Sequence, residues 1–159
     1  MEFQDTLSAA EQGNADAQYR LGLIYANGQG VELDYAEAIR WYTKAAEQGN
    51  VKAQFNLGRI YKNGKGVEVD YTEAARWHTK AAEQGHAKAQ FNLGRMYING
   101  HGVEANDAAA VRWFQKAAEQ GNEAAQNSLA KMTEKGRGCA TLFFILASMA
   151  GVLGVLESI

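Results

Sequence analysis

The sequence repeats itself every 36 residues without a single insertion. The stretch Ala-Ala-Glu-Gln-Gly occurs at 9–13, 45–49, 81–85 and 117–121, and Asn-Gly-x-Gly-Val occurs at 27–31, 63–67 and 99–103. Full units therefore run over 14–49, 50–85 and 86–121, with half units at 2–13 and 122–138. A period of this length is typical of solenoids, in which each unit packs only against its neighbours.

Each unit has the pattern of two helices. In the first unit a helix is predicted over 15–27, because apolar residues recur at helical spacing along one face: Ala17, Leu21, Ile24 and Tyr25. Asn27 and Gly28 end it, since both residue types tolerate a left-handed backbone. A second helix is predicted from Asp34, which with Glu37 forms a capping box, to Gly49.

Glycine inside the first helices predicts tight packing between helices. Gly22, Gly58 and Gly94 recur at one phase, although glycine costs about 1 kcal/mol relative to alanine in a helix. We expect the partner helix to approach closely there, with Trp or Tyr filling the adjoining space. The core prediction includes Trp41, Trp77 and Trp113. The predicted fold is all-α, an α/α superhelical solenoid of 36-residue helix–turn–helix repeats.

These motifs resemble a known repeat family. Leu21-Gly22-x-x-Tyr25, Asn27-Gly28-x-Gly30-Val31 and Trp41-Tyr42-x-Lys44-Ala45-Ala46 resemble the SEL-one-like repeat (SLR), a relative of the tetratricopeptide repeat. The resemblance covers 2–138 and implies a bacterial adaptor or scaffold for other proteins, with the first helix of each unit on the concave face. Some secreted members carry a cysteine pair in every repeat. This chain has only Cys139, so an activity of that subgroup is not carried over.

The sequence predicts no catalytic residues, no metal site and no cofactor. His78, His86 and His101 occupy three unrelated phases of the repeat, so they do not form a metal-binding pattern. The Gly-x-Gly pairs follow no strand and precede no Gly-Lys-Ser/Thr, which is typical of helix-ending turns rather than phosphate loops. A net charge of −2 argues against a nucleic-acid partner.

Charge is distributed unevenly between the two helices of each unit. The first helices with their leading turns, 14–27, 50–63, 86–99 and 122–135, hold eight basic and three acidic residues. By the resemblance, the concave face is then basic and the convex face acidic. The alternative is that these charges are only solvated.

Residues one repeat apart form rows along a solenoid, and several such rows consist of arginine, lysine or asparagine. Arginine offers a planar fork to carboxylates, and asparagine can pair with peptide groups. This chemistry suits an extended peptide with acidic side chains or a free C-terminal carboxylate. The predicted binding residues are Arg20, Lys52, Asn56, Arg59, Asn63, Lys88, Asn92, Arg95, Asn99 and Lys131.

The chain divides into a repeat solenoid at 1–138 and an apolar tail at 139–159. Residues 139–156 carry no charge, and as a helix they would span about 27 Å, close to the roughly 30 Å of a hydrocarbon core. Lys131, Lys135 and Arg137 precede the run, which predicts a cytoplasmic solenoid anchored to the inner membrane. A capping helix, a homodimer contact and a frameshift product are the alternatives.

The leading functional hypothesis is a non-catalytic adaptor that binds a protein or peptide. A membrane-associated structural assembly subunit is the first alternative, with the tail making the contacts. A hydrolase of the cysteine-rich secreted type is the second. Missing cysteines argue against it, as does a start, Met1-Glu2-Phe3, that lacks the basic and apolar regions of a signal peptide.

Overall fold

The computed structural model describes residues 2–134, and every regular element in this part of the chain is a helix. The helices are α1 (Phe3–Glu11), α2 (Ala15–Asn27), α3 (Tyr35–Glu47), α4 (Val51–Asn63), α5 (Tyr71–Glu83), α6 (Ala87–Asn99), α7 (Asp107–Glu119) and α8 (Glu123–Glu134). The predicted all-α fold and the predicted bounds of α2 are confirmed. The apolar tail, 139–159, lies outside the described residues.

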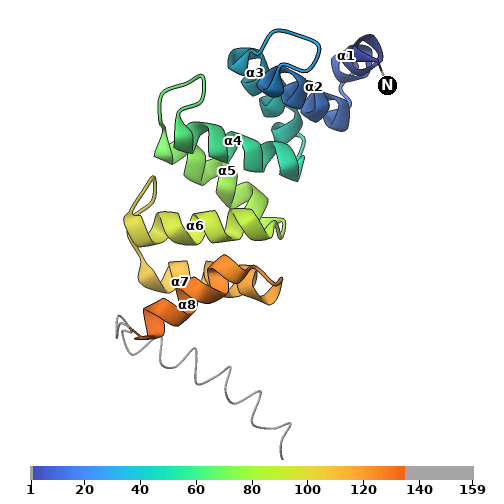
Figure 1. Cartoon of the computed structure of the whole chain (residues 1–159). Coiled ribbons are helices and arrows are strands. Elements are labelled where there is room, and N and C mark those ends of the chain that lie inside the picture. Colours follow the sequence, from blue (N-terminus) through green and yellow to red (C-terminus); the bar gives the residue numbers. More distant parts are fainter. Residues whose placement is uncertain (1, 135–159) are drawn as a thin grey trace, which may run out of the picture.

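The helices form a stack in which each one packs against the next along the chain (Figure 1). We call α2, α4, α6 and α8 the first helices and α1, α3, α5 and α7 the second helices. Consecutive first helices lie side by side, and α2 contacts α4 directly. The stack is therefore the predicted solenoid, and residues of one repeat phase recur along it.

Helix ends follow the predicted turn chemistry, with one exception. Gly28 has φ 61°, in the left-handed region, and Asp34 Oδ1 accepts a hydrogen bond of 3.0 Å from the backbone N–H of Glu37. The capping box also predicts that the Glu37 carboxylate accepts a hydrogen bond from the Asp34 N–H, and this prediction was wrong. The Asp34 N–H donates to the carbonyl of Tyr25, and the Glu37 carboxylate pairs with Arg40 at 2.9 Å.

The core runs through all repeats. The first helices contribute leucines that are fully buried, and the second helices contribute small alanines: Leu21, Leu57, Leu93, Ala38, Ala74 and Ala110. Trp41 and Trp77 are buried as predicted, whereas Trp113 is only partly buried. Two cationic side chains, those of Arg76 and Lys80, lie over the Trp77 ring, and Lys116 lies over the Trp113 ring.

The helical glycines face aromatic rings of the following second helix. The prediction of Trp or Tyr there is confirmed for Gly22, which faces Tyr42, and was wrong for Gly58 and Gly94. The rings are those of Tyr42, His78 and Phe114. A Cβ atom on Gly58 would lie 2.6 Å from the His78 ring, which is closer than real Cβ contacts. His78 is completely buried. Glycine is therefore required where the two helices touch.

A row of buried glutamines links the repeats. The Gln54 amide nitrogen donates to the carbonyl of Ala46 at 3.0 Å, and its oxygen accepts from Gln84 at 2.8 Å. Gln18 and Gln90 make the same two bonds one repeat earlier and later. Each amide thus joins three successive helices, and we call the row the glutamine ladder. Sequence reasoning did not find it.

Candidate functional site

Pockets open between consecutive first helices, and two of them extend to side chains of the second helices. One lies between α2 and α4, has a volume of about 200 Å³ and is named here the Tyr42 pocket. Its walls are Leu23, Ala26, Asn27, Tyr35, Tyr42, Asn56, Arg59, Ile60, Asn63 and Lys65. The Phe114 pocket lies between α6 and α8, with about 330 Å³, lined by Phe91, Arg95, Ile98, Asn99, Asp107, Phe114, Ser128, Lys131 and Met132.

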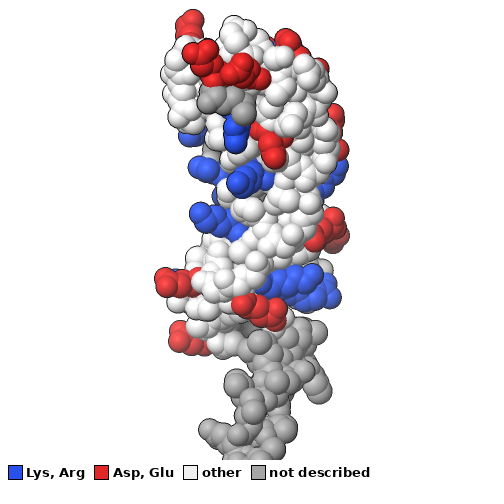
Figure 2. Space-filling model, turned by 90° about the vertical axis from the view of Figure 1, so that its right-hand side faces the viewer, with Lys and Arg blue, Asp and Glu red and all other residues white. Residues whose placement is uncertain are grey.

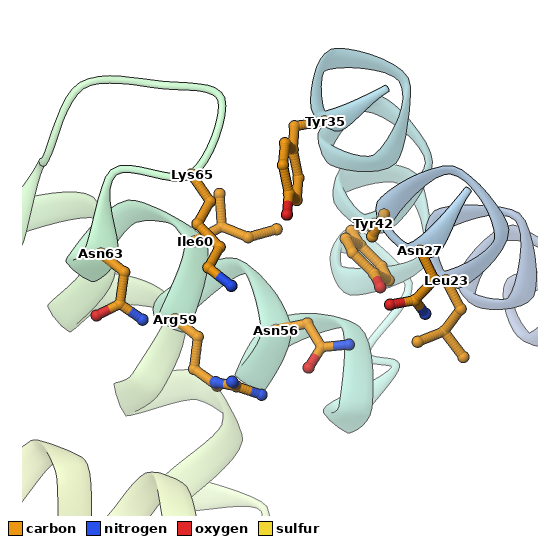
Figure 3. Close-up of a pocket in the computed structure, with 10 residues that line it drawn as sticks. Leu23, Asn27, Tyr35, Tyr42, Asn56, Arg59, Ile60, Asn63 and Lys65 are labelled. Carbon is orange, nitrogen blue, oxygen red and sulfur yellow. The ribbon is translucent and has the colours of Figure 1, made fainter. Parts of the chain in front are cut away.

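The Tyr42 pocket is lined by hydrogen-bond donors and holds no carboxylate. Figure 3 shows Tyr42, Asn56 and Arg59 around the space between α2 and α4. Burial raises the pKa of Tyr42 to about 12, although its hydrogen bond with Asn56 and the nearby Arg59 act in the opposite direction. The phenol therefore stays protonated at neutral pH and keeps its ability to donate.

Two further pockets lie nearer the N-terminal ends of the first helices and are related by one repeat. The first, of about 470 Å³, is lined by Asp16, Tyr19, Arg20, Leu23, Asn50, Val51 and Lys52. The second, of about 370 Å³, is lined by Tyr19, Lys52, Phe55, Asn56, His86, Ala87 and Lys88. His86 closes the second pocket because its ring caps α6, accepting from the Ala89 N–H, and stacks on Phe55 at 4.5 Å.

The structure brings most of the predicted binding residues together around these four pockets. Nine of the ten line at least one of them: Arg20, Lys52, Asn56, Arg59, Asn63, Lys88, Arg95, Asn99 and Lys131. The tenth, Asn92, is partly buried on α6 and lines none of the four. Their role in binding stays a prediction.

Basic side chains crowd along the first helices. Burial lowers the pKa of Lys62, and the neighbouring Arg95 and Arg59 lower it further by repulsion. Figure 2 shows Lys and Arg side chains in a column over the middle of the stack, with Asp and Glu side chains above and below it. An anionic partner would relieve this repulsion.

Sequence reasoning missed the pocket residues that come from outside the first helices. Tyr42 and Phe114 belong to second helices, and Lys65 belongs to the loop after α4. A usable signal was present, because the phase of Tyr42, His78 and Phe114 varies in chemistry while the Trp directly before it and the Lys two residues after it stay constant.

Two kinds of feature are absent from the described residues. Within 2–134 there is no group of three or more His, Cys, Asp or Glu side chains placed to hold a metal ion. Across the same residues, no helix has both the length and the apolar character needed to cross a bilayer. Cys139 and the uncharged run 139–156 lie outside the described residues.

Comparison with known proteins identifies the family. The Sel1 repeat model matches residues 15–50, 51–86 and 87–122, so the chain belongs to the Sel1 repeat family, as the SLR resemblance predicted. Proteins of this family generally serve as protein–protein interaction scaffolds and are generally non-catalytic. No curated protein sequence matches the chain.

Solved structures support the assignment. A Sel1 repeat protein from Oxalobacter formigenes is 43% identical with a TM-score of 0.75, over 80% of this chain and 96% of that one. A protective antigen of uropathogenic Escherichia coli with an SLR fold is 41% identical, with a TM-score of 0.81 over 86% of this chain. This chain spans only 29% of that antigen. Helicobacter pylori cysteine-rich protein B is 29% identical, with a TM-score of 0.61, over 78% of this chain and 89% of its own.

Proposed function

We propose that this protein is a non-catalytic adaptor that binds an extended, acidic segment of another protein along its first helices. The observation that carries the proposal is the gathering of nine predicted binding residues around pockets between successive first helices. The partner would lie across the helices, so that one pocket after another contacts it. Repeat arrays commonly bind in this way, over an extended surface.

Charge supports an anionic partner. Arg59 and Arg95 lie one repeat apart, are exposed, and each stands over an aromatic ring, that of Phe55 or Phe91. An arginine held over a ring has fewer conformations to lose when it binds a carboxylate. The two guanidinium groups can therefore bind acidic groups on one extended chain.

A charge-reversal experiment tests the adaptor proposal. The whole chain is immobilised and used to capture partners from a cell extract, alongside the double variant Arg59→Glu with Arg95→Glu. We expect the double variant to lose capture while its circular dichroism stays helical. Capture by the unchanged chain should also weaken as salt rises, because exposed charges are screened within about 8–10 Å at ordinary ionic strength.

A matched control separates the site from net charge. Lys44→Glu with Lys80→Glu makes the same change in net charge on exposed positions of α3 and α5, also one repeat apart. This control should capture as well as the unchanged chain. Equal capture by all three proteins would place the binding site elsewhere and end the proposal.

A second candidate is an adaptor held at the cytoplasmic face of the inner membrane by 139–156. The supporting observation is the run of 18 residues without charge, preceded by basic residues. Cell fractionation with an alkaline wash tests it. Recovery of the whole chain in the washed supernatant as a monomer would count against the membrane-held adaptor and favour the unattached one.

A further inference from the structure

The Tyr42 and Phe114 pockets occupy the same place in the repeat, two units apart. Eight of the residues that line them correspond at a spacing of 72. Asparagine stands at both equivalent positions 27 and 99, and Arg59 corresponds to Lys131. The molecule therefore presents one binding geometry twice, and differences between the two linings report differences in what each can bind.

The two pockets differ in the chemistry of their walls. In the first, Tyr42 carries a protonated hydroxyl and Asn56 an amide, beside the cations Arg59 and Lys65. These groups all donate hydrogen bonds, which is the requirement of a carboxylate.

The Phe114 pocket lacks two of these donors but keeps its cations, because Lys131 takes the place of Arg59 and Arg95 that of Leu23. Phenylalanine replaces the tyrosine, and Ser128 replaces the asparagine. Ile98 takes the place of Ala26 and adds apolar area, and the Phe91 ring lies 5.7 Å from the Phe114 ring. Apolar walls with cations on exposed positions suit an apolar side chain on an otherwise acidic segment.

The spacing between the pockets sets a length for the ligand. Packed helices lie about 10 Å apart, so two repeats separate the pockets by roughly 20 Å. An extended chain advances about 3.3 Å per residue, so roughly six residues cover this distance.

We propose that the ligand of this protein is an extended segment with a carboxylate in the Tyr42 pocket and a large apolar side chain, about six residues away, in the Phe114 pocket. The inference rests on the proposed adaptor function and adds which ligand group binds in each of the two pockets. Tyr42 and Phe114 are then the residues that determine specificity.

A peptide series tests the inference with the whole chain. The probes are fluorescent peptides of about twelve residues in a Gly/Ser background, each with one Glu and one Leu separated by about three, six or nine positions. We expect the tightest binding at six. Omitting either the Glu or the Leu should weaken binding about tenfold, which is what one lost anchor costs.

Reciprocal variants identify the pocket. Tyr42→Phe gives the Tyr42 pocket the aromatic residue of the Phe114 pocket, and Phe114→Tyr does the reverse. Each variant differs from the unchanged chain by one hydroxyl group. Tyr42→Phe should weaken only the peptides that carry Glu, by about fivefold to tenfold. Phe114→Tyr should weaken only those that carry Leu.

The outcomes separate this inference from the adaptor proposal. Binding that ignores the separation of Glu and Leu, or that neither variant changes, would overturn the inference, while the charge-reversal experiment would still judge the adaptor. Displacement of the probe by a lysine-tagged peptide of 139–156, at equal affinity, would overturn it in favour of this chain's own segment as occupant. Chain self-association that Ile98→Glu abolishes would overturn it in favour of a second copy.

Discussion

The central repeat and the α7–α8 end of the described chain share one sequence pattern, but equivalent positions have different surroundings. Gln54 in α4 is buried and bonded to helices before and after it, whereas Gln126 in α8 is exposed and bonded to the carbonyl of Ala118 at 3.3 Å. Gly58 touches the buried His78 ring, but exposed Ala130 takes its phase in α8.

This difference shows that the surroundings of a repeat residue determine whether it is buried and how many hydrogen bonds it makes. The neighbouring helices determine whether the same side chain is buried and hydrogen-bonded. Energies in repeat proteins follow the same rule, since interfaces between units contribute beside the units themselves. The comparison can be tested by making the same change in the centre and at the end.

The largest difference is expected for tryptophan. Trp77→Ala should lower the free energy of unfolding by about 3–5 kcal/mol, because a fully buried indole leaves a cavity that neighbours cannot fill. Trp113→Ala should cost less, about 2 kcal/mol, since that ring is already partly exposed. Urea denaturation followed by circular dichroism measures both. Equal losses would show that burial does not separate the two repeats.

Acid should weaken the central repeat through His78. Burial lowers its pKa to about 4, helped by the charges of Lys62, His86 and Arg59. In the unfolded chain the imidazole takes up its proton near pH 6.5, so stability is lost as the pH falls from there towards 4. The lost stability should reach about 3 kcal/mol near pH 4.

A phenylalanine variant isolates this effect. His78→Phe places in the centre the ring that Phe114 already supplies beside Gly94. Its free energy of unfolding should fall less between pH 7 and pH 4 than that of the unchanged chain. All carboxylates and His86 are common to both proteins, so the difference reports His78 alone. Parallel curves would mean that His78 is solvated in the folded protein.

The fold could be read from the sequence because the repeat presents the same evidence several times. The bounds of α2 and the left-handed glycine at its end follow from local patterns alone. The partners of Asp34 and Gln54 could not be read in this way. Asp34 bonds to a carbonyl nine residues away, and Gln54 bonds to a side chain 30 residues away, so both depend on how the helices pack.

Only the part of the candidate site that lies on the first helices could be predicted from the sequence. Arg59 and Asn63 were found from periodicity, and they line one pocket. Tyr42 and Lys65 complete that pocket from a second helix and a loop, whose positions relative to α4 are set by tertiary packing. Periodicity places residues in a row but does not say what lies opposite.

Steric contact at the helical glycine should produce a smaller difference, which opposite substitutions at one repeat phase can measure. Gly58→Ala adds a methyl group 2.6 Å from the His78 ring, so the free energy of unfolding should fall by about 1–3 kcal/mol despite the better helix propensity of alanine. Ala130→Gly should cost about 1 kcal/mol or less, from propensity alone. Thermal denaturation of both variants is the measurement, and a stabilised Gly58→Ala protein would disprove the tight contact.

The smallest expected difference concerns the glutamine ladder. Gln54→Ala removes an amide that bonds to Ala46 and Gln84 while buried, and it leaves the Ala46 carbonyl without this donor. Its cost should be about 1–2 kcal/mol, the usual penalty for an unmade buried hydrogen bond. Gln126→Ala should cost less than about 0.5 kcal/mol, because water replaces the exposed amide. Hydrogen exchange adds a local readout: Gln54→Ala should speed exchange of the Gly49 and Asn50 amides, at the turn that joins α3 to α4. Equal costs for the two variants would show that the ladder contributes nothing beyond its separate hydrogen bonds, and the central and terminal repeats would then differ only in their apolar packing.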